Sequence, residues 1–413
     1  MKTIRKPNPA KMQILGYQHP EPGMKYVYNP CLIREGNAVF NPLTEEAAII
    51  EDEAADKTQM VRRWYLVPEG TDVKSLSHMI RQVLLTAATV PGMAKIGYTI
   101  FTTTGCNACC EYCFEKDFDV IVMSDQVARD VGAYIVKTRS KKEPVVVRWF
   151  GGEPLCNKGA ITTICGILTE KKVDFTSEVT TNGDLLPSCT DEEFRAWHLT
   201  KVQLTADDVG AEYERIKGLP AGAYERMHAS IDRLDALGIK VSVRVHLDPE
   251  KGTDPCYRVI NDMLQHPHVS MYARMLYGDN TEKDFRDLLG VEQYMIDHGR
   301  MSNAFPRYAS GTHCMADRQT YATIGPKGDL SPCEHFAYGP EMYGSIYTIH
   351  KKGDVLARWK ERVKHMDAYC DTCPLYPMCE KICACTSEGT CELGYRWYLI
   401  ERIKRVLKGG IKA

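Results

Sequence analysis

The chain has 413 residues, of which 44% are hydrophobic and 26% charged, and its formal net charge is −2. This balance is typical of a globular protein with a sizeable core, and it gives no electrostatic case for binding nucleic acid. No apolar run approaches the roughly 20 residues of a membrane span, and the opening lacks the apolar segment of a signal peptide. We therefore expect a cytoplasmic protein that partners neither nucleic acid nor membrane.

Residues 1–92 are predicted to form a small α+β region that ends at Pro91-Gly92. We expect strands at 25–33, 38–40 and 63–67, a helical stretch from Thr44, and a helix at 72–87. Basic residues gather near both chain ends and are interpreted as solvated, as charge runs usually are. They are Lys2, Arg5, Lys6 and Lys11, and Arg402, Lys404, Arg405 and Lys408.

Residues 93–300 alternate between strand and helix patterns. Strands are predicted at 98–103, 145–150, 174–181, 201–205, 240–246 and 269–276, and helices at 124–137, 161–171, 224–237 and 291–299. Strands separated by helices indicate βαβ units and a parallel sheet. The fold class is therefore α/β, with a partial (β/α)6 TIM-type barrel whose functional groups should lie at the carboxyl ends of the strands.

Residues 301–400 lose this regularity and are rich in cysteine, and the chain ends in a helix predicted at 393–407, so that residues 401–413 form its last part. The 17 cysteines are bunched, which in a reducing compartment indicates metal more often than disulfides.

The first cysteine group directly follows the first strand of the alternating region and is spaced Cys106-x3-Cys110-x2-Cys113. Three thiolates at this spacing can hold three irons of a cubane cluster and leave the fourth iron open. Zinc would need a fourth ligand, and no histidine lies in this loop. Cys109 offers a different pairing, so the spacing alone does not decide which thiols bind.

This loop resembles the signature of the radical S-adenosylmethionine (radical SAM) superfamily, in which an aromatic residue, here Tyr112, precedes the last cysteine. The next strand ends in Gly151-Gly152-Glu153-Pro154, similar to the glycine-rich turn of the family. The resemblance implies that this turn approaches the methionyl end of the cofactor, where a Cβ would collide.

Softer matches to the family follow the later strands. Thr181-Asn182-Gly183 ends the third strand, and Asn182 is implied as a cofactor contact, although a plain turn is an alternative. Thr205 and Asp207 fall where relatives contact the cofactor ribose or line the substrate pocket, while Asp208 replaces the usual glycine.

Three basic residues complete the candidates. Arg215 is implied to reach the cofactor carboxylate, with a surface arginine as the alternative. Arg244 and His246 end the fifth strand, where they could face the pocket or be ordinary strand residues. No catalytic residue is assigned; Asp207 and His246 are the candidates.

The second cysteine group resembles the seven-cysteine SPASM domain, which carries two auxiliary [4Fe-4S] clusters. The resemblance implies an outer cluster on Cys370, Cys373, Cys379 and Cys391, and an inner one on Cys314, Cys333 and Cys383. The inner cluster would either keep an open iron or take its fourth ligand from His313, Cys385 or a distant thiol such as Cys256. Six cysteines are predicted to be packing residues: Cys31, Cys109, Cys156, Cys165, Cys189 and Cys256.

The resemblance implies an enzyme that cleaves S-adenosylmethionine reductively to a 5′-deoxyadenosyl radical and oxidatively modifies a ribosomally made peptide (RiPP). The product would be a thioether or carbon–carbon crosslink, or a related side-chain change, and the electron donor a flavodoxin or ferredoxin. Residues 1–92 would bind the leader of the precursor peptide as a winged-helix-like element, or serve as structural cover.

Other functions remain open alternatives. The first is a sulfatase-maturase-like enzyme or a small-molecule radical SAM oxidase, and the more distant one is a non-catalytic metal or electron-transfer protein.

Overall fold

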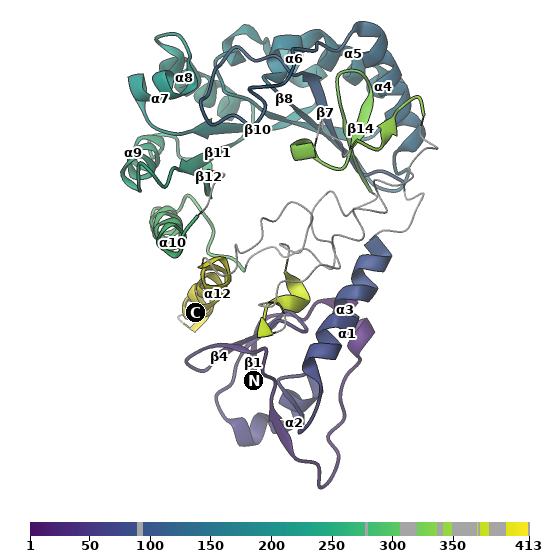
Figure 1. Cartoon of the computed structure of the whole chain (residues 1–413), viewed down its shortest axis with the longest axis vertical. Helices are drawn as coiled ribbons and strands as arrows, with labels where there is room; N and C mark the ends of the chain where they lie inside the picture. The colour runs from purple at the N-terminus through teal and green to yellow at the C-terminus, as the bar shows by residue number, and fades with distance from the viewer. Residues whose placement is uncertain are drawn as a thin grey trace.

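A computed structural model of the chain describes residues 1–88, 94–276, 280–305, 320–336, 342–348, 370, 372–379 and 394–411. A large α/β unit lies at one end of the molecule and the N-terminal region at the other, with the C-terminal helix between them (Figure 1). Among the helices that the structure describes, none is long and apolar enough to cross a membrane.

The α/β unit is built on six parallel strands that follow one another in chain order. They are β7 (Gly97–Thr103), β8 (Val145–Gly151), β9 (Phe175–Thr180), β10 (Leu199–Ala206), β11 (Lys240–Leu247) and β12 (Ser270–Met275). Each corresponds to a predicted strand, so the α/β class and the partial barrel are confirmed.

Helices follow these strands: α4 (Asp125–Thr138), α5 (Lys158–Glu170), α6 (Asp191–Ala196), α7 (Gly210–Lys217), α8 (Ala223–Ala236), α9 (Asp254–Met263) and α10 (Glu282–Asp297). The sequence prediction missed α6, α7 and α9 and began α10 nine residues late. The missed start of α10 is a capping box, in which the Thr281 side chain and the Asp284 carboxylate cap each other's backbone N–H groups.

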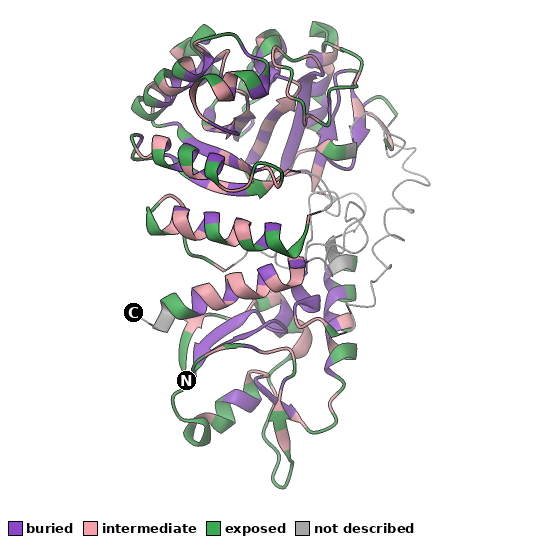
Figure 2. Cartoon of the chain, turned by 60° about the vertical axis from the view of Figure 1, so that its left-hand side comes forward, coloured by how far each residue is buried: buried purple, intermediate pink, exposed green. Residues whose placement is uncertain are grey.

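Burial alternates along β8, where Val145, Val147 and Trp149 are fully buried and Arg148 is half-buried. Figure 2 shows buried and less buried residues following one another along strands of this sheet. The buried set packs with residues of α4 and α5 in one apolar core. Because side chains on a strand alternate between faces, the other face of the sheet carries the polar residues. Arg148 there pairs with Glu178 of β9 at 3.2 Å.

The sheet continues beyond residue 300. β13 (Tyr321–Ile324) pairs with β7 in parallel, and β14 (Asp329–Ser331) and β15 (Gly344–Ser345) add antiparallel strands. β13, β14 and β15 therefore extend the barrel sheet, and Cys333 of the second cysteine group follows β14 directly in the chain.

The N-terminal region contains an antiparallel sheet in the order β1 (Lys2–Arg5), β5 (Glu46–Ile49), β4 (Ala38–Asn41) and β3 (Ile33–Glu35). A strand pair, β2 (Tyr26–Tyr28) and β6 (Leu66–Pro68), and the helices α1 (Pro9–Leu15), α2 (Glu53–Arg62) and α3 (Val73–Ala88) complete it. The predicted helix over 72–87 is confirmed as α3, and Pro91-Gly92 lies outside the described residues.

The helical stretch predicted from Thr44 is wrong. Residues 46–49 form β5, which pairs with β4 on one side and β1 on the other. Glu45 has a φ of +57°, a left-handed conformation that turns the chain into the strand. Pairing on both sides therefore overrides the helix propensity of glutamate and alanine.

The C-terminal helix α12 (Arg396–Ile411) is confirmed, but its basic residues are not all solvated. Arg402 and Arg405 lie 3.2 and 3.0 Å from the same oxygen of Glu292, whose side chain is 1% exposed. The Tyr398 hydroxyl donates to the other oxygen at 2.7 Å. These arginines fasten α12 to α10, because a buried carboxylate needs such partners.

Candidate cluster and cofactor site

The first cysteine loop begins where β7 ends, at the carboxyl end of the parallel strands. Cys106, Cys110 and Cys113 all have free thiols there. Burial raises the pKa of Cys106 to about 12 and also raises the pKa of Cys113, and the neighbouring Cys110 adds to both shifts. Cys110 is therefore near enough to affect the ionisation of both other predicted ligands.

Cys109 is held against the end of α7 by its backbone. Its N–H donates to the Lys217 carbonyl at 2.7 Å, and a Cβ on Gly218 would lie only 3.1 Å from the Cys109 Cβ. Cys109 thus lies against the end of α7, which favours the spacing Cys106, Cys110, Cys113. The prediction that Cys109 is a packing residue is wrong, because it is exposed.

The donor set of this loop fits an iron–sulfur cubane better than zinc. Within the described ranges, no three histidine, cysteine or carboxylate side chains gather around one ion position. A zinc site needs such a gathering, whereas each thiolate of a cubane binds a different iron. Three thiols on one loop are the donor set that a cluster with one open iron would need.

The glycine turn after β8 packs directly on the beginning of the cysteine loop. Gly151 has a φ of +115°, and a Cβ there would lie 2.1 Å from the Thr103 carbonyl oxygen. A Cβ on Gly152 would lie 2.4 Å from the Gly105 carbonyl oxygen. Glycine is therefore required at both positions in this structure, because two backbone segments approach each other too closely for a Cβ.

Glu153 is the fully buried carboxylate of this turn, and Pro154 behind it is also buried. Its oxygens accept hydrogen bonds from the Leu155 N–H at 3.0 Å, and from the Thr181 hydroxyl and the Asn182 N–H at 2.9 Å each. Burial outweighs these donors and raises the pKa of Glu153 to about 7. The ends of β8 and β9 are thereby joined through one side chain.

Asn182 extends this junction to the cysteine loop. Its amide donates to Asn107 at 2.8 Å and approaches the Cys106 sulfur at 3.9 Å. Asn107 in turn donates to Asp184 at 2.9 Å. Cys156, just after the glycine turn, is exposed and close enough to add to the raised pKa of Cys106, so its predicted packing role is wrong.

A buried charge network closes the opposite side of the loop. Lys217 Nζ lies 2.8 Å from Asp207 Oδ2, and their side chains are 3% and 7% exposed. The Tyr112 hydroxyl donates to the same oxygen at 2.8 Å, and His246 Nδ1 lies 2.8 Å from the other. The structure therefore brings together three of the predicted residues, Tyr112, Asp207 and His246, around a lysine that sequence analysis missed.

The protonation states of this network follow from its contacts. Burial opposes the charge on Asp207, but Lys217 and His246 outweigh it, so the pKa of Asp207 is lowered. Burial likewise opposes the charge on Lys217, and Asp207 outweighs it and raises the pKa well above its ordinary value. Burial lowers the pKa of His246. The network holds an ion pair with a neutral imidazole beside it.

Arg215 and Lys217 lie on different faces of α7. The Arg215 side chain is 57% exposed and pairs with Glu212 at 2.8 Å, and its role toward a cofactor stays a prediction. Lys217 follows Tyr213 by four residues, and both are buried on one face of the helix. That spacing is the sequence signal that could have identified Lys217.

The remaining strand-end candidates keep their predicted places. Thr205 is half-buried on β10. Asp208, which replaces the usual glycine, has no left-handed φ and forms a two-bond pair with Arg258 at 2.9 and 2.7 Å. An aspartate is thus accommodated there without backbone strain.

The second cysteine group is described in part. Cys333 is buried, and Cys370, Cys373 and Cys379 pack around Tyr376. Cys165, Cys189 and Cys256 are buried as predicted, and Cys31 is half-buried near Cys373. The other predicted ligands and their alternatives lie outside the described residues: Cys314, Cys383, Cys391, His313 and Cys385.

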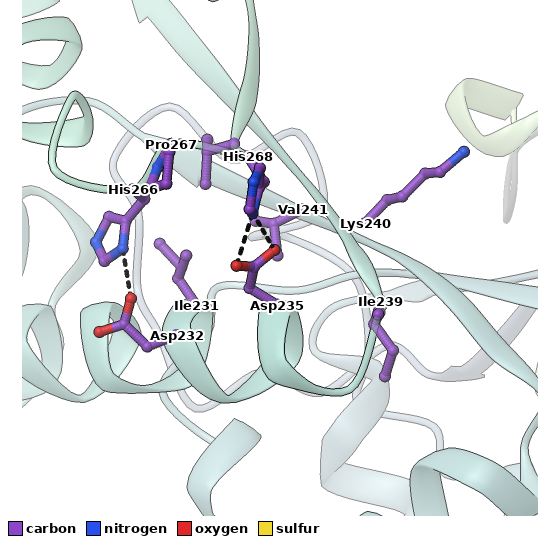
Figure 3. A pocket seen from close by; sticks show the side chains of 11 residues that line it. Ile231, Asp232, Asp235, Ile239, Lys240, Val241, His266, Pro267 and His268 are labelled. Carbon is purple, nitrogen blue, oxygen red and sulfur yellow. Dashed lines mark hydrogen bonds and ion pairs between the residues drawn. The ribbon is translucent and has the colours of Figure 1, made fainter.

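A pocket elsewhere in the barrel is not part of this site. It lies between α8 and the amino-terminal ends of β11 and β12, where His266 and His268 contact Asp232 and Asp235 at 2.8 Å (Figure 3). In barrels of parallel strands that end serves stability, whereas the reacting groups lie at the carboxyl ends, where the cysteine loop begins.

Comparison with known proteins agrees with this geometry. Residues 100–255 match the family model described as "Radical SAM superfamily". A GTP 3′,8-cyclase of Clostridium perfringens is 23% identical over 266 residues, which cover 58% of this chain and 80% of that protein.

Solved structures share the fold at low identity. One is anSMEcpe with bound AdoMet and Cp18Cys peptide, with a TM-score of 0.59 and 13% identity, covering 76% of this chain and 97% of that one. Another is Streptococcus suis SuiB bound to precursor peptide SuiA, with a TM-score of 0.53 and 13% identity, covering 86% and 95%.

Proposed function

We propose that the protein, whose residues 100–255 match the radical SAM superfamily model, uses S-adenosylmethionine to oxidise a ribosomally made peptide. The observation that carries the proposal is the trio of free thiols at the end of β7, ringed by Glu153, Asn182 and the Asp207–Lys217 pair. When bound, the cluster supplies an electron and the cofactor supplies the group that removes a hydrogen atom from the substrate.

Different residues of the chain would bind the cluster and S-adenosylmethionine. Cys106, Cys110 and Cys113 would hold the cluster. The cofactor's amino acid end carries both charges, and the site offers a buried carboxylate on Glu153 and a buried ammonium on Lys217. We propose Lys217, together with or in place of Arg215, as the cation that faces the cofactor carboxylate. Tyr112 and His246 keep Asp207 in place.

A peptide substrate is supported by the shared fold with anSMEcpe and SuiB, both solved with peptides. The sheet of the N-terminal region has β1 and β3 as its outer strands, and an outer strand can pair with an extended peptide. We therefore keep leader binding by residues 1–92 in the proposal.

Two arginines on β11 and β12 indicate which chemical group the peptide substrate brings to the site. Arg244 of β11 and Arg274 of β12 flank the Tyr272 ring at 5.6 and 5.3 Å, and Arg244 donates to its hydroxyl at 2.9 Å. Arg274 pairs in register with His246, next to the cofactor network. Among the described residues no carboxylate pairs with either arginine, so we propose that a carboxylate of the peptide lies between them.

The arginines also permit a second candidate function, which the similarity to a GTP cyclase favours: a nucleotide whose phosphates occupy the same place. Saturation-transfer NMR on the metal-free protein separates the two. A blocked Gly-Gly-Glu-Gly-Gly peptide should bind and its glutamine counterpart should not; GTP bound in preference to both would favour the nucleotide. The Arg244→Gln/Arg274→Gln variant should lose binding, and Arg129→Gln on the surface of α4 should not.

Auxiliary clusters complete the proposal. Cys370, Cys373 and Cys379 with Cys391 would hold one, and Cys314, Cys333 and Cys383 the other. These clusters would accept the electron that an oxidised peptide gives up, with a flavodoxin or ferredoxin as the reductant of the first cluster.

The central test is production of 5′-deoxyadenosine by anaerobically reconstituted protein with dithionite, measured by chromatography. Cys110→Ala should abolish it, whereas Cys109→Ala and Cys156→Ser should retain it. Loss in Cys109→Ala with retention in Cys110→Ala would contradict the assigned trio. Co-expression with a candidate precursor peptide, followed by mass spectrometry, then reports the modification.

A further inference from the structure

The N-terminal region reaches into the second cysteine group through α3. Arg81 is 4% exposed, and its two terminal nitrogens donate to the Tyr376 carbonyl at 2.8 Å and the Cys379 carbonyl at 3.1 Å. Its guanidinium also lies 5.0 Å from the centre of the Tyr376 ring. A single buried cation therefore contacts the first residue of the short turn η5 (Tyr376–Met378) and the backbone of Cys379, which directly follows it.

A second cation approaches the same turn from α1. Lys11 is fully buried and donates to the Pro377 carbonyl at 2.9 Å and the Pro42 carbonyl at 3.1 Å. Its charge is balanced by Glu45 at 3.0 Å. The interpretation of Lys11 as part of a solvated terminus is thus wrong, because it joins the N-terminal sheet to the cysteine turn.

Neutral contacts complete this junction. His78, one turn before Arg81 on α3, stacks on Tyr376 with ring centroids 4.5 Å apart. Cys31 of the N-terminal region lies close enough to Cys373 for the two thiols to interact. The turn between Cys373 and Cys379 is therefore fixed by residues that lie about 300 positions earlier in the chain.

Buried cations are costly, so their position needs a compensating anion or dipole. Arg81 finds carbonyl dipoles, and thiolates that carry a cluster would add negative charge beside it. A fixed positive charge near a cluster favours its reduced form, which has the more negative charge, and hydrogen bonds to the cluster act in the same way.

We propose that Arg81 and Lys11 are positioning residues of the auxiliary cluster, which hold the turn of Cys373 and Cys379 and raise the reduction potential of the cluster bound there. The inference rests on the proposed function only in requiring that these cysteines bind a cluster. The N-terminal region is then part of the electron-transfer machinery as well as a candidate peptide-binding element.

The test uses the full chain with Cys106, Cys110 and Cys113 all changed to alanine, so that only auxiliary clusters contribute. After anaerobic reconstitution, the midpoint potential is read from redox titration followed by electron paramagnetic resonance, and cluster retention from the rate of iron release to a chelator. Arg81→Gln should lower the reduced-to-oxidised ratio at fixed potential at least tenfold, which is about 59 mV for one electron, and should release iron faster.

Two further variants separate charge from fold. Arg81→Lys keeps the charge, so its potential should stay near that of the parent while iron release is faster. Arg62→Gln is the matched control, because Arg62 also stacks on a tyrosine, Tyr17, at 5.1 Å, but at the surface of the N-terminal region.

A shift in Arg81→Gln no larger than that of Arg62→Gln would overturn the proposal while leaving the proposed function intact. Absence of iron from the triple-alanine parent would overturn it together with the auxiliary clusters. The 5′-deoxyadenosine assay on the unaltered cysteine loop is independent of both outcomes.

Discussion

Replacing Lys217 with methionine tests the buried network that closes the cofactor site. The change keeps the length of the side chain and removes the charge, which leaves Asp207 in a place that is 7% exposed. Breaking a buried ion pair from one side costs about 3–5 kcal/mol. Asp207 keeps its bonds from Tyr112 and His246, so we expect the lower value, about 3 kcal/mol.

For a folding unit the size of the barrel, each kcal/mol shifts the melting temperature by about 2–4 °C, so the expected loss is about 6–12 °C. Thermal unfolding of the metal-free protein, followed by circular dichroism at pH 8, measures it. Lys217→Met/Asp207→Asn should recover most of the loss, because neither charge is then buried alone. Arg215→Met, on the exposed face of the same helix, is the control and should change little.

The loss should also depend on pH. In the parent the pKa of Asp207 is lowered, so its contribution is present above its unfolded pKa and is lost only as pH falls through the lowered value. In Lys217→Met the burial of Asp207 is no longer compensated, its folded pKa rises, and the deficit should grow as pH rises from about 5 to 8. A deficit equal to that of Arg215→Met, or unchanged in the double variant, would refute this reasoning.

Three other predictions concern the scaffold. Gly151→Ala should cost about 4 kcal/mol, because it adds a Cβ 2.1 Å from a carbonyl at positive φ, whereas Gly166→Ala in open space on α5 should be neutral or stabilising in the same melts. Glu292→Gln should cost about 3 kcal/mol by freeing two arginines of α12, with exposed Glu282→Gln as control; equal melting temperatures would contradict it. Because the folded pKa of Glu153 is raised to about 7, stability should fall as pH rises from about 5 to 7, and Glu153→Gln should flatten this slope.

The barrel was predictable because its strands and several of its helices carry strong periodic patterns. The strand ends Thr103, Gly151, Thr180 and Ala206 all lie within three residues of the predicted ends. Residues 46–49 were read as helical because local propensity cannot report pairing with β1 at the far end of the region. A short helix such as α7 has too few turns for a clear period, and Lys217 was missed with it.

Site residues that are recognised by their spacing in the sequence could be predicted. Site residues that are recognised only by their tertiary contacts could not. The spacing of Cys106, Cys110 and Cys113 identified a cluster loop, but only the contact of Cys109 with α7 indicates which pairing applies. The sequence predicts a role for Arg215 and gives none to Lys217, because only the packing of α7 shows that Lys217 is on its buried face. No sequence pattern connects Arg81 to Cys379, because the contact joins segments 298 residues apart.

The central claim is that Cys106, Cys110 and Cys113 hold a cluster with an open iron, and it is tested most directly in full-length protein lacking the second cysteine group. With Cys314, Cys333, Cys370, Cys373, Cys379, Cys383 and Cys391 all changed to alanine, reconstituted protein should retain about four irons per chain. Its reduced electron paramagnetic resonance spectrum should change when S-adenosylmethionine is added. Zinc in place of iron, or a spectrum that the cofactor leaves unchanged, would contradict the account.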